Sequence, residues 1–417
     1  MSNSFHLHPN RDRIQRDILT LAEMVDKTKP GWTRRPFTPW YKQSRAWLKE
    51  QMETCGLDVK TDAGANLIGT MAGTDDHCKP IMIGSHTDTV TGGGRFDGII
   101  GVVAGLEIAR RLQETGTRLR HPLEIVDFTA EEPSEFGIST IGSRAMVGHL
   151  SPEMMERTDQ SGLKLKDGIQ MMGGAPNRIA EFTRKQGDVS LYLELHIEQG
   201  PVLEQSNKQL GVVTGIVGIH RYRVIVEGKP NHAGTTPMNM RFDALTGASQ
   251  LVLELENLCK ATYADPVVGT VGKLMNEPNG ANVVPGRVTF ELEVRSLDAG
   301  IIETIIDKFS RFSNHIAAYR SLEISLDNLS KSEAIRVLPE IQDKISKACA
   351  AAGSTMYLPS GAGHDANQLA NIAPVGMIFV PSSDGRSHCP EEWTDYVDVA
   401  RGIEAMARAL LEFDRSI

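Results

Sequence analysis

The chain has 417 residues, of which 40% are hydrophobic and 23% are charged, and its formal net charge at pH 7 is −9. These values are typical of a globular protein with two domains and exclude a fibrous or disordered chain. The acidic balance argues against nucleic-acid binding, and no apolar run is long enough for a membrane span or a secretory signal. We therefore expect a cytoplasmic protein that binds neither nucleic acid nor membrane.

The first half of the chain alternates helix and strand patterns, as an α/β domain does. Helical periodicity is expected at residues 10–27, at 43–55 and from Gly98 onward, and strands are expected at 58–60, 66–71, 80–83, 122–129 and 189–195. The short apolar runs at 80–83 and 122–129 have the length and bulk of buried strands. Ligands of open α/β sheets collect at the carboxyl ends of such strands, so polar residues there are candidates for a site.

From about residue 213 the pattern changes to the β-α-β-β-α-β order of a ferredoxin-like domain. The expected elements are a strand at 221–226, a helix at 241–259, strands at 267–275 and 286–296, a helix at 301–318 and a strand at 322–327. The chain then returns to the α/β pattern of its first half, with a helix expected at 334–350, a strand at 374–380 and a helix at 395–413. We predict an α/β domain with a central mixed sheet, residues 1–212 and 330–417, interrupted by an α+β ferredoxin-like insert at 213–329.

Histidines and carboxylates follow the ends of the expected strands. They are His86, Asp88, Asp97, Glu131, Glu132, His196 and His388. Imidazoles combined with carboxylates suit a divalent cation of hard to borderline character, and one carboxylate can bridge two such ions. The set therefore predicts a two-metal hydrolase.

The spacing of these residues suggests their roles. Asp97 lies in a glycine-rich loop that can wrap between two ions, and Asp88 is placed to orient the imidazole of His86. The adjacent side chains of Glu131 and Glu132 project in different directions, so one can bind metal while the other serves as general base. Each residue taken alone has a plainer interpretation, because a strand-end histidine is usually a satisfied polar group and paired glutamates often begin a helix.

Seven motifs spread over the chain together resemble the M20 metallopeptidase superfamily. They are H-T-D at 86–88, R-F-D-G at 95–98, E-E at 131–132, E-L-H-I-E-Q-G at 194–200, N-H-A-G-T-T-P-M at 231–238, S-G-A-G-H-D-A at 360–366 and S-H-C-P at 387–390. More narrowly, they resemble its hydantoinase/carbamoylase branch, which holds N-carbamoyl-L-amino-acid hydrolases, β-ureidopropionase and allantoate amidohydrolase. The resemblance runs from about residue 10 to the end of the chain.

This resemblance implies two divalent metal ions per subunit, zinc or manganese, with cobalt and nickel also compatible with the ligands. It assigns His86, Asp97 and His196 to one ion, and Asp97, Glu132 and His388 to the other. It makes Glu131 the general base and proton shuttle, and Asp88 the partner of His86. The same resemblance implies that the inserted domain closes over the site as a lid and forms the interface of a homodimer.

The resemblance also implies residues that contact a small carboxylate substrate. His232 would stabilise the oxyanion, Asn282 and Arg295 would hold the substrate carboxylate, and Gln199 and Gly363 would line the pocket. Arg295 lies on the polar face of its strand, where a bidentate clamp is possible, although an exposed strand arginine is the ordinary interpretation. The expected reaction is cleavage of the C–N bond of a small N-carbamoyl amino acid or ureido acid. The alternative is an M20 aminoacylase or dipeptidase that acts on N-acyl amino acids or dipeptides.

Three positions depart from the pattern of allantoate amidohydrolases. They are E-F-G at 135–137, Ile219-His220 and Cys389, where that pattern has glutamine near 219 and asparagine at 389. These departures disfavour allantoate as the substrate and leave the metal ligands untouched. Two other functions stay open: a non-catalytic dimer stabilised by metal, which would have no use for a base at Glu131, and a nucleotide-binding loop at the glycines 92–94.

Overall fold

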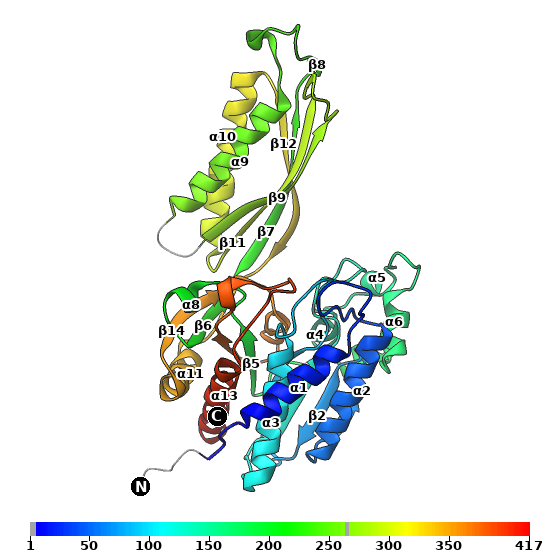
Figure 1. The fold of residues 1–417 in the computed structure, drawn as a ribbon, viewed down its shortest axis with the longest axis vertical. Helices are drawn as coiled ribbons and strands as arrows, with labels where there is room; N and C mark the ends of the chain where they lie inside the picture. Colours follow the sequence, from blue (N-terminus) through cyan, green and yellow to red (C-terminus); the bar gives the residue numbers. More distant parts are fainter. Residues whose placement is uncertain (1–5, 263–266) are drawn as a thin grey trace. The chain divides into compact units, whose positions relative to one another are not determined.

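The computed structural model describes residues 6–262 and 267–417, and the chain forms two compact units (Figure 1). Unit 1 comprises Met1–Thr214, Val337–Leu358 and Ala362–Ile417, and unit 2 comprises Gly215–Arg336 and Pro359–Gly361. The expected insert at 213–329 ends earlier than unit 2, because the last strand of the unit 2 sheet continues to Ser332. No helix of the described residues has the length and apolar character needed to cross a membrane.

A mixed sheet forms the centre of unit 1. The strands of this sheet are β1 (Asp58–Thr61), β2 (Leu67–Met71), β3 (Ile81–His86), β4 (Leu123–Phe128), β5 (Leu191–Ile197), β6 (Leu210–Ile216), β13 (Ile335–Arg336), β14 (Thr355–Ser360) and β15 (Val375–Val380). Their order is β1-β2-β4-β3-β5-β15-β6-β13, with β14 paired to β6. The four central strands β4, β3, β5 and β15 are parallel, and every residue in them is buried. Because both faces of these strands are buried, their sequences are nearly continuous runs of apolar residues.

Helices surround this sheet. The helices of unit 1 are α1 (Arg11–Glu23), α2 (Pro39–Thr54), α3 (Ile99–Thr115), α4 (Ile141–Met146), α5 (Pro152–Met155), α6 (Leu165–Met171), α7 (Ile179–Phe182), α8 (Val202–Gln205), α11 (Pro339–Ala352), α12 (Ala366–Leu369) and α13 (Tyr396–Ser416). Helix α3 contacts β3, β4 and β5, and its residues from Ile99 to Arg110 are all buried. Gly101 and Gly105 allow this close approach, since a Cβ atom would lie 2.6 Å from Leu195 O and 2.7 Å from Ile125 Cγ2, respectively.

Several expected elements of unit 1 differ in extent from those observed. The helix expected at 334–350 begins only at Pro339, because proline lacks an N–H and fits the first helical position. Strands β6 and β14 were not expected as separate elements.

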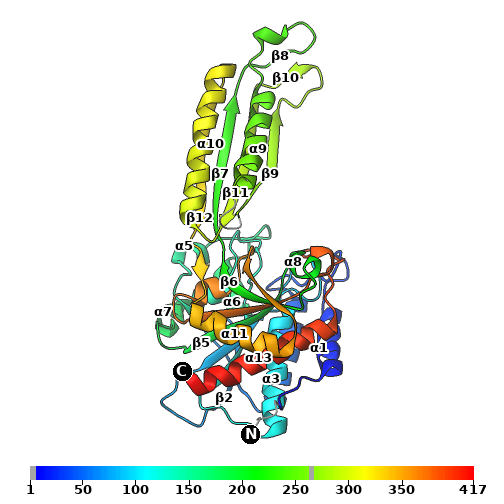
Figure 2. The same ribbon diagram turned by 90° about the vertical axis from the view of Figure 1, so that its left-hand side faces the viewer.

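Unit 2 has the β-α-β-β-α-β order that the sequence predicts. The elements of this order are β7 (Gly218–Glu227), α9 (Ala244–Lys260), β9 (Val267–Glu277), β11 (Arg287–Ser296), α10 (Ala299–Arg320) and β12 (Glu323–Ser332). The four strands are antiparallel in the order β12-β7-β11-β9, and both helices pack on one face of the sheet (Figure 2). A two-stranded ribbon, β8 (Asn231–His232) with β10 (Val283–Val284), completes the unit.

Candidate metal centre

The candidate site lies where four neighbouring parallel strands of unit 1 end. His86 is the last residue of β3, and His196 is the next-to-last residue of β5. Glu131 and Glu132 follow β4, and His388 lies in the connection between β15 and α13. Because the strand order is β4-β3-β5-β15, the sheet brings these separate segments to one edge, where ligands of α/β sheets collect.

Two groups of ligand atoms meet at this edge. His86, Asp97 and His196 offer atoms within 4.8 Å of one another, and so do Asp97, Glu132 and His388. Asp97 belongs to both groups: its Oδ1 is 3.1 Å from His196 Nε2 and its Oδ2 is 3.1 Å from His388 Nε2. One carboxylate that presents a different oxygen to each group has the arrangement of a bridging ligand. Among the described residues a third group, Glu194, His196 and His364, overlaps the first at His196.

The orientation of the histidines fits a bound cation. The Nδ1 atoms of His86 and His196 lie 3.0 and 2.9 Å from the carbonyl oxygens of Asp88 and Ile197, which leaves each Nε2 facing the site. His196 Nε2 has no hydrogen-bond partner among the described residues, although Asp97 Oδ1 is beside it. Such a pair requires a positive charge, supplied either by a proton on the ring or by a metal ion. Gly98 keeps the space beside His86 open, because a Cβ atom there would lie 2.3 Å from His86 Nε2.

Asp88 holds the two glutamates by their backbone. Its Oδ1 accepts the N–H of Glu131 at 3.1 Å and its Oδ2 accepts the N–H of Glu132 at 3.2 Å. The distance from Asp88 Oδ1 to His86 Nδ1 is 3.8 Å, which is too long for a hydrogen bond. Asp88 therefore orients His86 through its main-chain carbonyl, whereas the side chain fixes the segment that carries the expected base.

The crowding of acids at this edge moves their pKa values apart. Burial raises the pKa of Glu131 well above its ordinary value, and the charges of Asp365 and Glu132 add to the shift although His86 opposes it. Burial together with the charge of Asp97 raises the pKa of Glu132 to about 7. The pKa of Asp97 is well below its ordinary value, because the imidazoles of His196 and His388 outweigh its burial. Opposed shifts of this kind are typical of active sites.

The backbone is strained at three residues of the site. Ala130, Gln199 and His388 have φ angles of 52°, 57° and 57°, in the left-handed region that non-glycine residues rarely adopt. Each such residue costs roughly 1–3 kcal/mol and persists only where its surroundings enforce it. Around Ala130 the enforcing contacts come from the start of α4, since Ile141 N–H donates to Ala130 O. Seven other non-glycine residues of the described chain also have positive φ angles, so strain of this kind is present at the site without being confined to it.

The residues expected to contact a substrate occupy several places. In unit 1, Gln199 Nε2 donates to Asp97 Oδ2 at 2.9 Å, and Gly363 lies in the loop between β14 and α12. In unit 2, His232 and Asn282 are exposed neighbours on the β8–β10 ribbon, where Ala233 N–H donates to Asn282 O. Arg295 lies near the end of β11, and its guanidinium donates to Glu293 Oε1 at 2.5 Å and to Gly361 O at 2.6 Å.

Three buried acids beside the ligand groups were not singled out from the sequence: Glu194, Asp365 and Glu392. Glu194 accepts from Ser85 Oγ and Tyr192 Oη, and Asp365 accepts from Ser143 Oγ. Glu194 and Asp365 lie inside quoted motifs, so their neighbours in sequence could have drawn attention to them. No signal separates Glu392 from the adjacent, exposed Glu391.

The glycine loop at 92–94 does not have the features of a phosphate site. The amide groups that follow it, those of Phe96 and Asp97, donate to the carboxylate of Glu392 at 2.9 and 3.1 Å. A phosphate would need these donors and would meet the negative charge of the carboxylate. These contacts argue against the nucleotide-binding interpretation of this loop.

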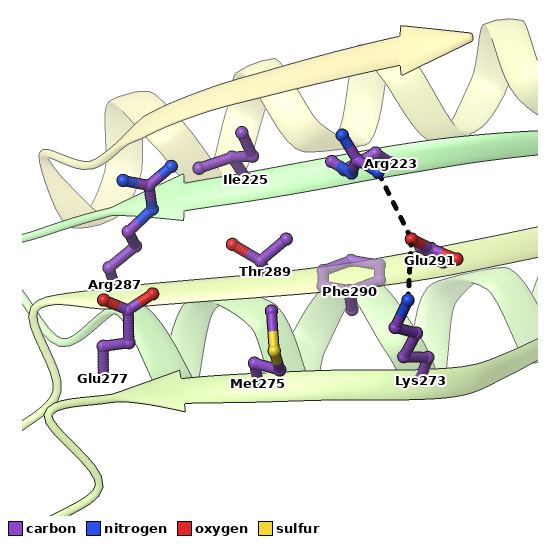
Figure 3. A pocket seen from close by; sticks show the side chains of 9 residues that line it. All are labelled: Arg223, Ile225, Lys273, Met275, Glu277, Arg287, Thr289, Phe290 and Glu291. Atoms are coloured by element: carbon purple, nitrogen blue, oxygen red, sulfur yellow. Dashed lines mark hydrogen bonds and ion pairs between the residues drawn. The ribbon is translucent and has the colours of Figure 1, made fainter. Parts of the chain in front are cut away.

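A shallow pocket of about 410 Å³ lies on the open face of the unit 2 sheet, between β7, β9 and β11 (Figure 3). Glu291 lies between Arg223 and Lys273 and pairs with both, at 3.5 and 3.3 Å. Arg287 also pairs with Glu227, at 3.6 Å. Because the cations already have acidic partners across the strands, this face is a cross-strand ion-pair ladder. None of the expected site residues lines it.

Comparisons with known proteins agree with the geometry. Residues 82–412 match the family described as Peptidase family M20/M25/M40. The chain is 38% identical over 406 residues to the N-carbamoyl-L-amino-acid amidohydrolase of Paenarthrobacter aurescens, with 97% of this chain and 98% of that protein covered. It is 35% identical over 399 residues to the allantoate amidohydrolase of Bacillus subtilis, with 94% of each chain covered. The crystal structure of an amidase of the hydantoinase/carbamoylase family from Burkholderia multivorans is similar, with a TM-score of 0.91, 32% identity, and 97% and 98% of the two chains covered.

Proposed function

Because the chain belongs to peptidase family M20/M25/M40, and within it to the hydantoinase/carbamoylase amidases, we propose that it is a metal-dependent amidohydrolase. The proposed reaction cleaves the C–N bond of a small N-carbamoyl-L-amino acid or a related ureido acid and releases ammonia. The observation that carries this proposal is the shared carboxylate of Asp97, which faces His196 with one oxygen and His388 with the other.

The proposed cofactors are two divalent ions, zinc or manganese, with cobalt or nickel as possible substitutes. His86, Asp97 and His196 would hold one ion, and Asp97, Glu132 and His388 the other. When bound, such ions polarise a carbonyl oxygen and lower the pKa of a water molecule. The support for this proposal is the donor chemistry, since imidazole nitrogens combined with carboxylate oxygens suit these metals.

In the proposed mechanism Glu131 is the general base. It takes a proton from the attacking water as the C–O bond forms, and returns it to the leaving nitrogen as the C–N bond breaks. Two features support this role. Burial raises the pKa of Glu131 well above its ordinary value, and a higher pKa makes the carboxylate a stronger base. Its backbone is held by Asp88, which limits the positions that the carboxylate can take.

We also propose that unit 2 is a lid that brings substrate contacts to the site. His232 would stabilise the oxyanion, and Asn282 with Arg295 would bind the substrate carboxylate, while Gln199 and Gly363 would line the pocket in unit 1. The pairing of β8 with β10 supports a joint role for His232 and Asn282, because it makes them neighbours. The planar guanidinium of Arg295 suits a carboxylate, which it can bind with two hydrogen bonds.

A homodimer formed through unit 2 is part of this proposal. Strand β9 lies at an edge of its sheet and exposes Val268, Leu274 and Met275, which are 56%, 43% and 54% exposed. A long apolar edge strand is normally covered by another chain or protected by charges. Light scattering after size exclusion would test the proposal: Leu274→Lys is expected to yield monomers, whereas Met171→Lys on α6 is expected to leave the dimer intact.

The experiment that tests the function is ammonia release from a panel of N-carbamoyl-L-amino acids, N-carbamoyl-β-alanine and allantoate. The metal-stripped protein would be reloaded with manganese or zinc and assayed with and without a chelator. We expect release from an N-carbamoyl amino acid that the chelator abolishes. Hydrolysis of N-acyl amino acids or dipeptides without ammonia release would contradict the proposed substrate and favour the aminoacylase or dipeptidase alternative.

A further inference from the structure

We propose that Glu392 is a positioning residue that sets the spacing between Asp97 and His388, and so the geometry of the second ligand group. Glu392 is 1% exposed and lies four residues after His388. Glu392 is not one of the residues proposed above to bind the metal ions or the substrate. The inference rests on the proposed function only in assuming that the group binds a divalent ion.

The contacts of Glu392 join the two segments that carry the ligands. Its Oε1 accepts the backbone N–H groups of Phe96 and Asp97, at 2.9 and 3.1 Å. Its Oε2 is 3.0 Å from Ser387 Oγ, which also lies 3.2 Å from Asp97 Oδ2. One carboxylate therefore holds the backbone of one ligand and, through a hydroxyl, the residue next to the other ligand.

Gly94 provides the space for this carboxylate. A Cβ atom at position 94 would lie 2.1 Å from Glu392 Oε1 and 2.2 Å from its Cδ. The backbone of Gly94 is not in the left-handed region, so its conformation does not itself require glycine. The position of the Glu392 carboxylate gives the physical reason for a glycine here.

A second contact joins the same two segments. The guanidinium carbon of Arg95 lies over the rings of Trp32 and Trp393, 4.5 and 4.9 Å from their centres. Arg95 precedes Phe96, and Trp393 follows Glu392, so this cation–π contact is adjacent to the carboxylate on both segments. The aromatic contact holds the loop as a whole, whereas Glu392 is the group bonded to the amide of the ligand residue itself.

The burial of Glu392 is consistent with this role. A buried carboxylate is costly unless hydrogen-bond donors satisfy it, and here two amides and one hydroxyl do so. Groups that orient metal ligands typically contribute about 10- to 100-fold to metal affinity. We therefore expect loss of the Glu392 acceptors to weaken binding of the ion at Asp97, Glu132 and His388 by about that factor. Binding of the ion at His86 and His196 should weaken less, because that ion shares only Asp97 with the segments that Glu392 holds.

The test is a cobalt titration of the metal-stripped, full-length protein, followed by its visible absorption spectrum. In Glu392→Leu, which fills the space but accepts no hydrogen bond, one of two binding steps should weaken about 10- to 100-fold. Glu392→Gln should restore most of the affinity, because its single carbonyl oxygen can still accept from both amides. Glu391→Leu, the exposed neighbour, is the matched control and should bind as the wild type does. Gly94→Ala should reproduce the Leu variant without altering Glu392.

Hydrolysis rates give a separate readout. In Glu392→Leu, kcat should fall while KM stays unchanged, because Glu392 contacts none of the residues proposed to bind the substrate. Wild-type binding of both ions by Glu392→Leu would overturn the inference, and so would equal weakening of both steps, which indicates general loosening. A wild type that binds two ions but hydrolyses no panel member would contradict the proposed function and leave this inference standing on the titration. A wild type that binds no divalent ion would overturn both.

Discussion

Replacement of Glu131 by glutamine separates catalysis from folding. The carboxylate lies 3.6 Å from His86 Nε2, while the position of its backbone depends on Asp88 and not on its own side chain. Glutamine has the same shape but cannot take a proton from water. Because burial already disfavours the charged form of Glu131, the neutral amide should not lower the stability of the fold.

The size of the effect follows from the role assigned to Glu131. General base catalysis contributes about 10²- to 10⁴-fold to a rate. At ~1.36 kcal/mol for each factor of ten, its loss raises the activation free energy by roughly 3–5 kcal/mol. We expect kcat for ammonia release to fall by that factor in Glu131→Gln, with unchanged metal content and an unchanged melting temperature of the metal-free protein.

Glu135→Gln is the matched control, since Glu135 lies nearby in sequence and pairs at the surface with Arg35, 2.7 Å away. An exposed ion pair contributes about 1 kcal/mol or less, so this variant should keep wild-type kcat and stability. General-base catalysis contributes at least about 10²-fold, so its loss cannot leave a tenth of the rate. If fully metal-loaded Glu131→Gln retained more than roughly a tenth of wild-type kcat, the assignment of Glu131 as the base would be refuted.

Two further substitutions test the space at the site and the contacts of unit 2. Gly98 and Gly116 flank helix α3 with φ angles of 69° and 65°, but a Cβ atom at Gly98 would lie 2.3 Å from His86 Nε2, whereas one at Gly116 meets nothing within 4 Å. In denaturant melts, both alanine variants should lose about 1–2 kcal/mol of unfolding free energy to backbone strain. In metal analysis, only Gly98→Ala should also have lost metal. Arg295→Gln should raise KM by about 10- to 100-fold, the effect of charge-assisted hydrogen bonds worth ~1.5–3 kcal/mol, while Arg223→Gln on the same face of the sheet should not. Equal KM values for the two arginine variants would contradict the carboxylate clamp.

The local pattern of the sequence predicted most elements but not their order in space. The apolar runs at 80–83 and 122–129 are strands because both faces of them are buried, and this much is visible in the residues themselves. Sheet order depends on contacts between segments far apart in the chain, which no local pattern encodes. Strand β15 lies next to β5, although well over a hundred residues separate them, and this pairing brings His388 to the edge that carries His196.

The candidate ligands were visible as residue types at strand ends, whereas the groups that hold them were not. Glu392 differs from Glu391 only in burial, and burial is set by the packing of its segment against Gly94. For a similar reason the sequence did not show which group of Asp88 would contact His86. The turn after β3 brings the Asp88 carbonyl to the ring and leaves the carboxylate free to accept the amides of the glutamates.

Asp88 and Glu392 both hold ligand-bearing loops by accepting backbone N–H groups with a carboxylate. They differ in how the two oxygens are used, and this difference leads to a further prediction. Each accepts two consecutive backbone N–H groups, but Asp88 uses one oxygen for each amide, whereas Glu392 uses Oε1 for both. In Asp88→Asn, one amide must therefore face an NH₂ group, and an unsatisfied buried donor costs about 1–3 kcal/mol. In Glu392→Gln, both amides keep their acceptor. We expect Asp88→Asn to lower the free energy of unfolding and kcat more than Glu392→Gln does, as measured by denaturant melts and ammonia release. The opposite ranking would show that the charge of these carboxylates, and not the number of acceptors, holds the loops.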